Sequence, residues 1–130
     1  MAKHILKKTN RKVAVKIAGA SANDTISLAV DCKHADETLG ATQNVTIQHV
    51  KWTGAAGATA TITRNATVIM VLQGDAASEL DFTDAEYIDD VESSEDINVV
   101  TSGEMAVYLV LRKENGYTTA DPQQYTTLPY

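Results

Sequence analysis

Hydrophobic and polar residues alternate along most of this chain with a period of two residues. Val13, Val15 and Ile17, for example, alternate with Lys12, Ala14 and Lys16. Successive side chains of a β-strand point to opposite faces, so this period predicts strands. The segments that show it are 12–17, 26–30, 44–54, 58–63, 67–73, 79–83, 97–101 and 105–111. Roughly seven to nine short strands separated by turn signals predict an all-β fold, an antiparallel β-sandwich or jelly roll with flexible N- and C-terminal arms.

The stretch from 44 to 74 organises the predicted sheets, because it holds three strand-patterned runs joined by compact turns. In its first run, Val45 and Ile47 have the opposite parity from Val50 and Trp52. A β-bulge near Gln48 and His49 would restore a single inward face. We therefore predict one irregular strand here and not two separate ones.

The second and third runs of this stretch predict a tight hairpin. Between 58 and 63, alanines and Ile62 alternate with threonines, which predicts a small-residue inner face and a hydroxyl outer face. The connection at 63–66 contains Asn65, a residue that tolerates the positive φ such turns require.

Two runs, 67–73 and 105–111, are apolar at both parities. A strand covered by protein on both faces has this pattern, so we predict two central strands that are neighbours in one sheet. The runs at 12–17 and 26–30 each keep a polar face, and the turn residues between them predict a hairpin with one wet face.

Two segments interrupt the strand pattern. Residues 32–43 predict a loop with a short turn of helix. The acidic segment 75–94 predicts a short strand around Leu80 and Phe82, and the three-residue spacing over 85–91 allows one or two helical turns.

The composition favours one globular domain without covalent staples. The chain has 130 residues, and 44% of them are hydrophobic, which suffices for a core of its own. The single cysteine, Cys32, excludes an internal disulfide. The N-terminus has no apolar leader, and no stretch of about eighteen apolar residues occurs. We therefore expect neither a signal peptide nor a membrane span, and a protein made and used in the cytoplasm or in something assembled there.

Charge is distributed unevenly along the chain, whose net charge is -6. Six of the eleven basic residues precede the first acid, Asp24. Eleven of the seventeen acids lie in 75–104, with no base among them. The pattern predicts a basic arm at 1–10, an acidic β-sandwich domain at 11–117 and a second arm at 118–130.

Each arm has two interpretations. The N-terminal arm is either a solvated tail or a clamp onto an acidic partner surface, whose binding would weaken as salt rises. Nucleic acid is a less favoured partner, because the overall charge is acidic and no aromatic residues alternate with the lysines. The C-terminal arm is either disordered or an extended segment whose tyrosines contact an adjacent subunit.

No run of residues assembles a reaction site. Asp31, Cys32, His34, Asp36 and Glu37 lie close together in the sequence, but their spacing matches no zinc motif. Cys32 beside His34 lacks the third, orienting group of a catalytic cysteine, which favours a half-buried structural thiol. The acidic segment lacks the central glycine of an EF-hand loop. We expect no catalytic residue, no metal ligand and no cofactor.

Three segments resemble small virion structural proteins of tailed bacteriophages: KWTGAAGATATITRNATVIMVLQG at 51–74, DDVESSEDINV at 89–99 and GEMAVYLVLRKENGY at 103–117. The resemblance implies a capsid decoration, or cement, protein that binds the major capsid protein lattice on the virion exterior as a homotrimer. Such a protein is made in the bacterial host cytoplasm. A neck or tail component is an alternative within the same resemblance.

Under this interpretation the arms supply the contacts to partners. The candidate partner-binding residues are Lys3, Lys7, Lys8, Arg11 and Lys12 for the capsid, and Tyr117, Tyr125 and Tyr130 for subunit contacts.

Two other classes of protein stay open. A carbohydrate-binding β-sandwich would need an exposed aromatic platform, for which Trp52 with Tyr87 or Tyr108 is the candidate. An enzyme would need acid, base or nucleophile side chains that converge in a pocket.

Overall fold

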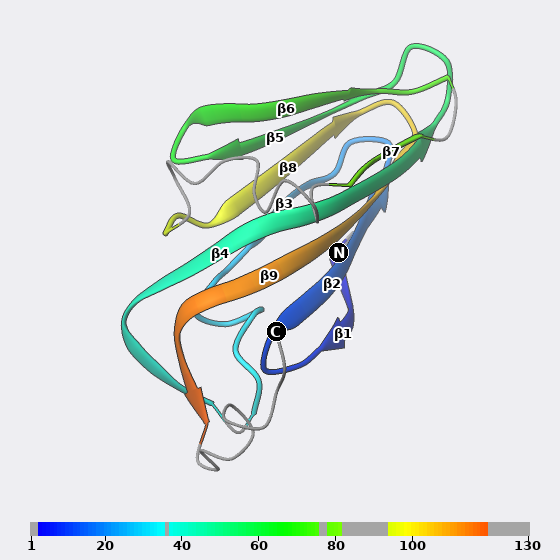
Figure 1. The fold of residues 1–130 in the computed structure, drawn as a ribbon. Coiled ribbons are helices and arrows are strands. Elements are labelled where there is room, and N and C mark those ends of the chain that lie inside the picture. Colours follow the sequence, from blue (N-terminus) through cyan, green and yellow to red (C-terminus); the bar gives the residue numbers. More distant parts are fainter. Residues whose placement is uncertain (1–2, 36, 76–77, 82–93, 120–130) are drawn as a thin grey trace.

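The computed structural model describes residues 3–35, 37–75, 78–81 and 94–119, which form two antiparallel β-sheets packed face to face (Figure 1). The strands are β1 (Lys3–Lys8), β2 (Lys12–Gly19), β3 (Asn23–Ile26), β4 (Glu37–Gly54), β5 (Thr59–Arg64), β6 (Thr67–Gln73), β7 (Ser78–Asp81), β8 (Ile97–Ser102) and β9 (Met105–Thr119). One sheet has the order β1-β2-β9-β4-β7, and the other has the order β3-β8-β5-β6. The predicted all-β sandwich is confirmed.

The core lies between the two sheets and consists mainly of aliphatic side chains. The inward residues of β2 are Val13, Val15 and Ile17, each exposed by 1% or less. Trp52 of β4 joins this core and donates a hydrogen bond from Nε1 to the Gln73 carbonyl, 2.9 Å away. Burial of these apolar faces is the main force that holds the sheets together.

The predicted irregularity in β4 is a β-bulge. Ile47 pairs with Leu111, whereas His49 pairs with the preceding residue of β9, Val110. Gln48 is therefore the extra residue, and the bulge turns Val50 inward, where it is fully buried.

The predicted hairpin between β5 and β6 is also confirmed. Arg64 pairs with Thr67, so Asn65 and Ala66 form a two-residue loop. Both have positive φ, 50° and 63°, as in a type I′ turn. This turn matches the twist of the strands that it joins.

The predicted positions of the two apolar strands are only half right. β9 is central in the five-stranded sheet, but β6 is an edge strand of the other sheet, so the two are not neighbours. Val68 and Val71 of β6 are 57% and 52% exposed. An apolar run has the same sequence pattern whether its second face is covered or not, and here it is uncovered.

The predicted hairpin of 12–17 with 26–30 is wrong, because the chain crosses between sheets after β2. β2 pairs with β1 and β9, while β3 pairs with β8. The Thr101 hydroxyl of β8 accepts from the Ala22 amide at 2.8 Å and donates to the Gly19 carbonyl at 3.0 Å, which anchors the crossing. A turn then begins at Ser27.

The predicted loop at 32–43 is shorter than expected, because β4 begins at Glu37. Glu37 pairs with Thr119 near the end of β9, and the register shifts between Leu39 and Asn44. Gly116 lies opposite this irregularity with φ of 89°, and a Cβ there would lie 2.2 Å from the Thr42 carbonyl oxygen. Only glycine fits this position, and β9 continues past it.

The predicted N-terminal arm is largely part of the fold, because residues 3–8 form β1 and pair with β2. The predicted Phe82 end of the acidic strand, the helical turns at 85–91 and residues 120–130 of the C-terminal arm lie outside the described residues. Within the described ranges no helix is long and apolar enough to cross a membrane.

Candidate functional site: a basic face on the five-stranded sheet

The outward side chains of the five-stranded sheet form rows that run across the strands. In one row Lys16 of β2, Tyr108 of β9 and Lys51 of β4 are cross-strand partners. In another, Lys12 pairs with Arg112. Because inward residues alternate with these, the register places five cations on one surface, which we call the basic face: Lys7, Lys12, Lys16, Lys51 and Arg112.

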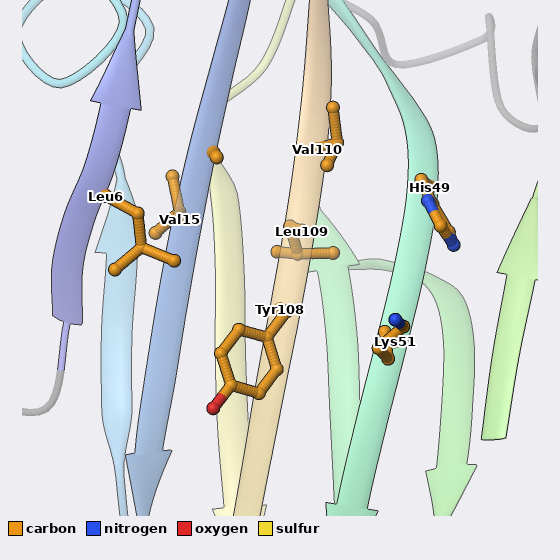
Figure 2. Close-up of a pocket in the computed structure, with 8 residues that line it drawn as sticks. Leu6, Val15, His49, Lys51, Tyr108, Leu109 and Val110 are labelled. Atoms are coloured by element: carbon orange, nitrogen blue, oxygen red, sulfur yellow. The ribbon is translucent and has the colours of Figure 1, made fainter. Parts of the chain in front are cut away.

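A groove of about 380 Å³ lies in the middle of the basic face (Figure 2). Its lining residues are Leu6, Ala14, Val15, His49, Lys51, Tyr108, Leu109 and Val110. Leu6 is 54% exposed and lies at the β1 bulge between Ile5 and Lys7. The Lys16 ammonium lies 5.9 Å from the centre of the Tyr108 ring, at the margin of the groove. The face thus combines an apolar floor with a positively charged rim.

Acidic residues border the basic face along β7. Glu79 and Asp81 are the cross-strand partners of Lys51 and His49. His49 Nε2 also lies 2.6 Å from Glu79 Oε2. Arg112 on β9 also has an acidic neighbour, because its Nε lies 3.2 Å from Glu114 Oε2. β1 and β2 carry basic residues and no acid.

The structure separates the five predicted capsid contacts. Lys7 and Lys12 lie on the basic face, whereas Lys3 occupies an inward register position opposite Ile17. The Lys3 ammonium donates to Asp31 Oδ2 at 2.7 Å and to the Thr25 carbonyl at 2.9 Å. Lys8 and Arg11 are partly buried. A run of basic residues in sequence is thus not one surface in the fold.

Sequence reasoning missed Lys16, Lys51 and Arg112 as members of this face. The strand pattern already placed Lys12 and Lys16 on the same side of one strand, which was a usable signal. Lys51 and Arg112 come from distant segments, and only the pairing of β4 and β9 brings them to the same surface.

Tyr117, which the sequence predicted to contact an adjacent subunit, is buried within its own chain. Its side chain is 7% exposed, and its hydroxyl donates to the Leu28 carbonyl at 2.6 Å. The Lys113 ammonium lies 4.4 Å from the centre of its ring. Burial raises the Tyr117 pKa above its usual value. Tyr125 and Tyr130 lie outside the described residues.

Lys113 and Glu37 form a buried ion pair near this end of the sandwich. Their side chains are 1% and 0% exposed, and the Lys113 ammonium also donates to the Thr9 carbonyl at 3.0 Å. Burial lowers the Lys113 pKa, while the hydrogen bond to Glu37 and the charge of its carboxylate oppose that shift. The pair ties the start of β4 to β9 and to the turn after β1.

The cysteine and its neighbours serve the fold. Cys32 is a fully buried free thiol, and burial raises its pKa to about 12. The His34 amide donates to Glu37 Oε1 at 2.7 Å, and Asp31 accepts from Lys3. Within the described ranges, no three histidine, cysteine or acidic residues gather as metal ligands. Asp36 lies outside those ranges.

The predicted aromatic platform for a glycan does not form around Trp52. Its side chain is 9% exposed and packs in the core. Tyr87 lies outside the described residues, and Tyr108 lies by itself on the groove. Trp52 therefore has a structural role.

No protein-family model and no curated protein matches this chain. The functional argument therefore starts from the basic face. A sheet surface with several cations around an apolar groove is suited to hold a partner that carries negative charges beside apolar side chains.

Proposed function

We propose that the chain is a bacteriophage virion structural protein that decorates the capsid. Its basic face would bind an acidic surface of the major capsid protein lattice on the shell exterior. The observation that carries the proposal is the alignment of Lys12 and Lys16 with Arg112 and Lys51 on one sheet surface around a groove. The resemblance of 51–74, 89–99 and 103–117 to phage virion proteins supports the proposal that the partner surface belongs to a phage particle.

An acidic protein surface fits this face better than a nucleic acid does. Nucleic-acid surfaces typically add several aromatic side chains on which bases stack, whereas among the described residues Tyr108 is the one tyrosine, tryptophan or phenylalanine that lines the groove. Glu79 and Asp81 border the face and would repel a phosphate backbone that extended across the sheet. The apolar floor around Leu6 and Val110 is hydrophobic surface that a protein partner would bury on binding.

Decoration does not require a tight single contact. A shell presents many copies of the same site, so modest binding of each subunit suffices to cover the lattice, and any link between subunits adds avidity. Electrostatic attraction to the basic face would speed association and make it dependent on salt.

Binding to undecorated shells of the encoding phage tests the proposal. The purified chain is sedimented with shells over a salt series, with a Lys16→Glu/Lys51→Glu variant in parallel. We expect the double reversal to weaken binding by tenfold or more, an order-of-magnitude estimate for two lost charge contacts. Lys33→Glu, whose lysine lies outside the basic face, is the matched control and should bind like the parent chain.

Three outcomes would contradict the proposal. Shell binding that ignores the double reversal would exclude the basic face. Tighter binding to a DNA duplex than to shells would favour nucleic acid as the partner. Antibody labelling of virions at the neck or tail, and not over the shell, would favour the alternative structural role.

A further inference from the structure

The four edge strands of the two sheets differ in how they are protected. An edge strand presents unpaired backbone groups that can pair with another chain, and charges or short length discourage this. β1 carries four basic residues, Lys3, His4, Lys7 and Lys8. β7 and β3 are each four residues long, and they contain Glu79, Asp81 and Asp24. These three edge strands are therefore protected against pairing with another chain.

β6 has neither charges nor short length to protect it, although a β-bulge at Ile69 interrupts its pairing with β5 between Val68 and Met70. It is seven residues long, its sequence is TVIMVLQ, and it contains neither a charged residue nor proline. It forms one edge of the four-stranded sheet (Figure 1), with Val68 and Val71 more than half exposed. The strands beside it continue an uncharged outer surface, with Thr59, Thr61 and Thr63 on β5 and Asn98 and Val100 on β8.

We infer that β6 pairs antiparallel with β6 of a second copy of this chain, which joins their four-stranded sheets across a two-fold axis. Antiparallel pairing of identical strands sets each residue against another residue of the same strand. In β6 every such pair is uncharged, and valine, isoleucine, methionine and leucine dominate. The same operation would set Lys3 against Lys8 in β1 and would bring four carboxylates into the short β7 contact, and like charges close together destabilise a sheet.

The net charge of the chain also favours β6 over the other edge strands for self-association. Each copy carries a net charge of -6, so two copies repel over most orientations. Contact through β6 and the uncharged surface beside it brings no charged strand residue of β5 or β8 into the interface, apart from Arg64, which is fully buried within its own chain. Backbone hydrogen bonds and burial of Val68 and Val71 then stabilise the pair.

This contact is independent of the proposed function, because the basic face lies on the other sheet. It leaves both basic faces of the pair uncovered and gives the assembly two of them. It also makes a dimer, whereas the resemblance to phage decoration proteins implies a homotrimer. The solution mass therefore distinguishes the two.

The test is light scattering of the full chain over a concentration series at low and high salt, with hydrogen exchange of residues 67–73. We expect a dimer that high salt does not dissociate, and slower exchange in β6 as the dimer forms. Val71→Lys should raise the dimer dissociation constant by about tenfold or more, because it places two lysines in an uncharged contact. Val30→Lys is the matched control, since Val30 is 70% exposed and outside every strand.

Several results would overturn the inference. They are a monomer at every concentration, a trimer, or a dimer that Val71→Lys leaves intact. Val68→Lys provides a second variant, and unchanged far-ultraviolet circular dichroism shows that each variant is folded. Shell binding depends on Lys16 and Lys51 instead, so a failure of one proposal leaves the other open to its own test.

Discussion

The guanidinium of Arg64 on β5 donates from Nη1 to the main-chain carbonyl of Val45 on β4, 2.7 Å away, and thereby connects the two sheets through the core. Arg64 is 0% exposed. Its Nε and Nη2 donate to the Glu95 carbonyl at 3.0 and 2.8 Å. Burial of a cation is unfavourable unless the cation is hydrogen-bonded. The same hydrogen bonds satisfy the carbonyl of Val45 on β4 and the carbonyl of Glu95 shortly before β8.

Replacing Arg64 should therefore destabilise the sandwich strongly. Arg64→Met removes the donors of the Val45 and Glu95 carbonyls, and we expect a loss of about 3–5 kcal/mol in the free energy of unfolding. Urea unfolding followed by Trp52 fluorescence measures it. Arg112→Met, at an exposed position, is the control and should change stability by ~0.5 kcal/mol or less. Equal stability of the two variants would mean that the link between the sheets contributes nothing.

The buried ion pair of Lys113 and Glu37 predicts a different mutational pattern. Glu37→Gln leaves the Lys113 ammonium buried without its counter-charge, and should cost about 3 kcal/mol. Lys113→Met combined with Glu37→Leu removes both charges and should recover part of that loss, because no buried charge is left, while the His34 amide and the Thr9 carbonyl each lose a hydrogen-bond partner. Urea unfolding of the single and combined variants is the measurement. A combined variant less stable than Glu37→Gln would contradict this explanation.

The Cys32 thiol predicts a loss of stability at alkaline pH. Its pKa rises from an ordinary value of 9.0 to about 12 in the native protein. Between these values the unfolded chain has lost a proton that the native chain keeps, so stability falls as pH rises. The contribution is complete below pH 9 and disappears toward pH 12, with a slope approaching ~1.4 kcal/mol per pH unit.

Cys32→Ala removes the titration of the thiol itself, while Lys113 and Tyr117, on whose pKa values Cys32 has a raising effect, titrate in both proteins. The difference in unfolding free energy between the parent chain and Cys32→Ala should be constant below pH 9 and shrink above it. Urea unfolding at a series of pH values provides the data. A difference that stays constant up to pH 11 would show that the thiol is not held in its neutral form by burial.

The turn between β5 and β6 offers a stabilising substitution. Ala66 has φ of 63°, a left-handed conformation that strains any residue with a Cβ. Ala66→Gly should stabilise the protein by about 0.5–1 kcal/mol. Ala106→Gly, within β9, is the control and should destabilise it, because glycine weakens a strand interior. Thermal unfolding measures both, and a lower melting temperature for Ala66→Gly would contradict the strain argument.

The sequence alone identified the features that depend on neighbouring residues. Alternation located most of the strands, because each strand has one face toward the core. The break in parity between Ile47 and Val50 located the bulge at Gln48, and Asn65 marked the turn before β6. In each case the deciding interaction is steric or lies within a few residues, so the local pattern carries the information.

Only the tertiary structure decided which strands are neighbours and which charges share a surface. The apolar pattern of β6 suited a central strand, yet its place in the sheet leaves Val68 and Val71 exposed. Tyr117 begins a segment with the composition of a surface tail, yet its hydroxyl donates to the Leu28 carbonyl and its ring lies against the Lys113 ammonium. Strand order depends on how whole apolar faces fit together and on contacts between residues far apart in the chain. Such contacts produce no periodic pattern in the sequence of either segment. The basic face depends on them, because they bring its lysines and arginine together.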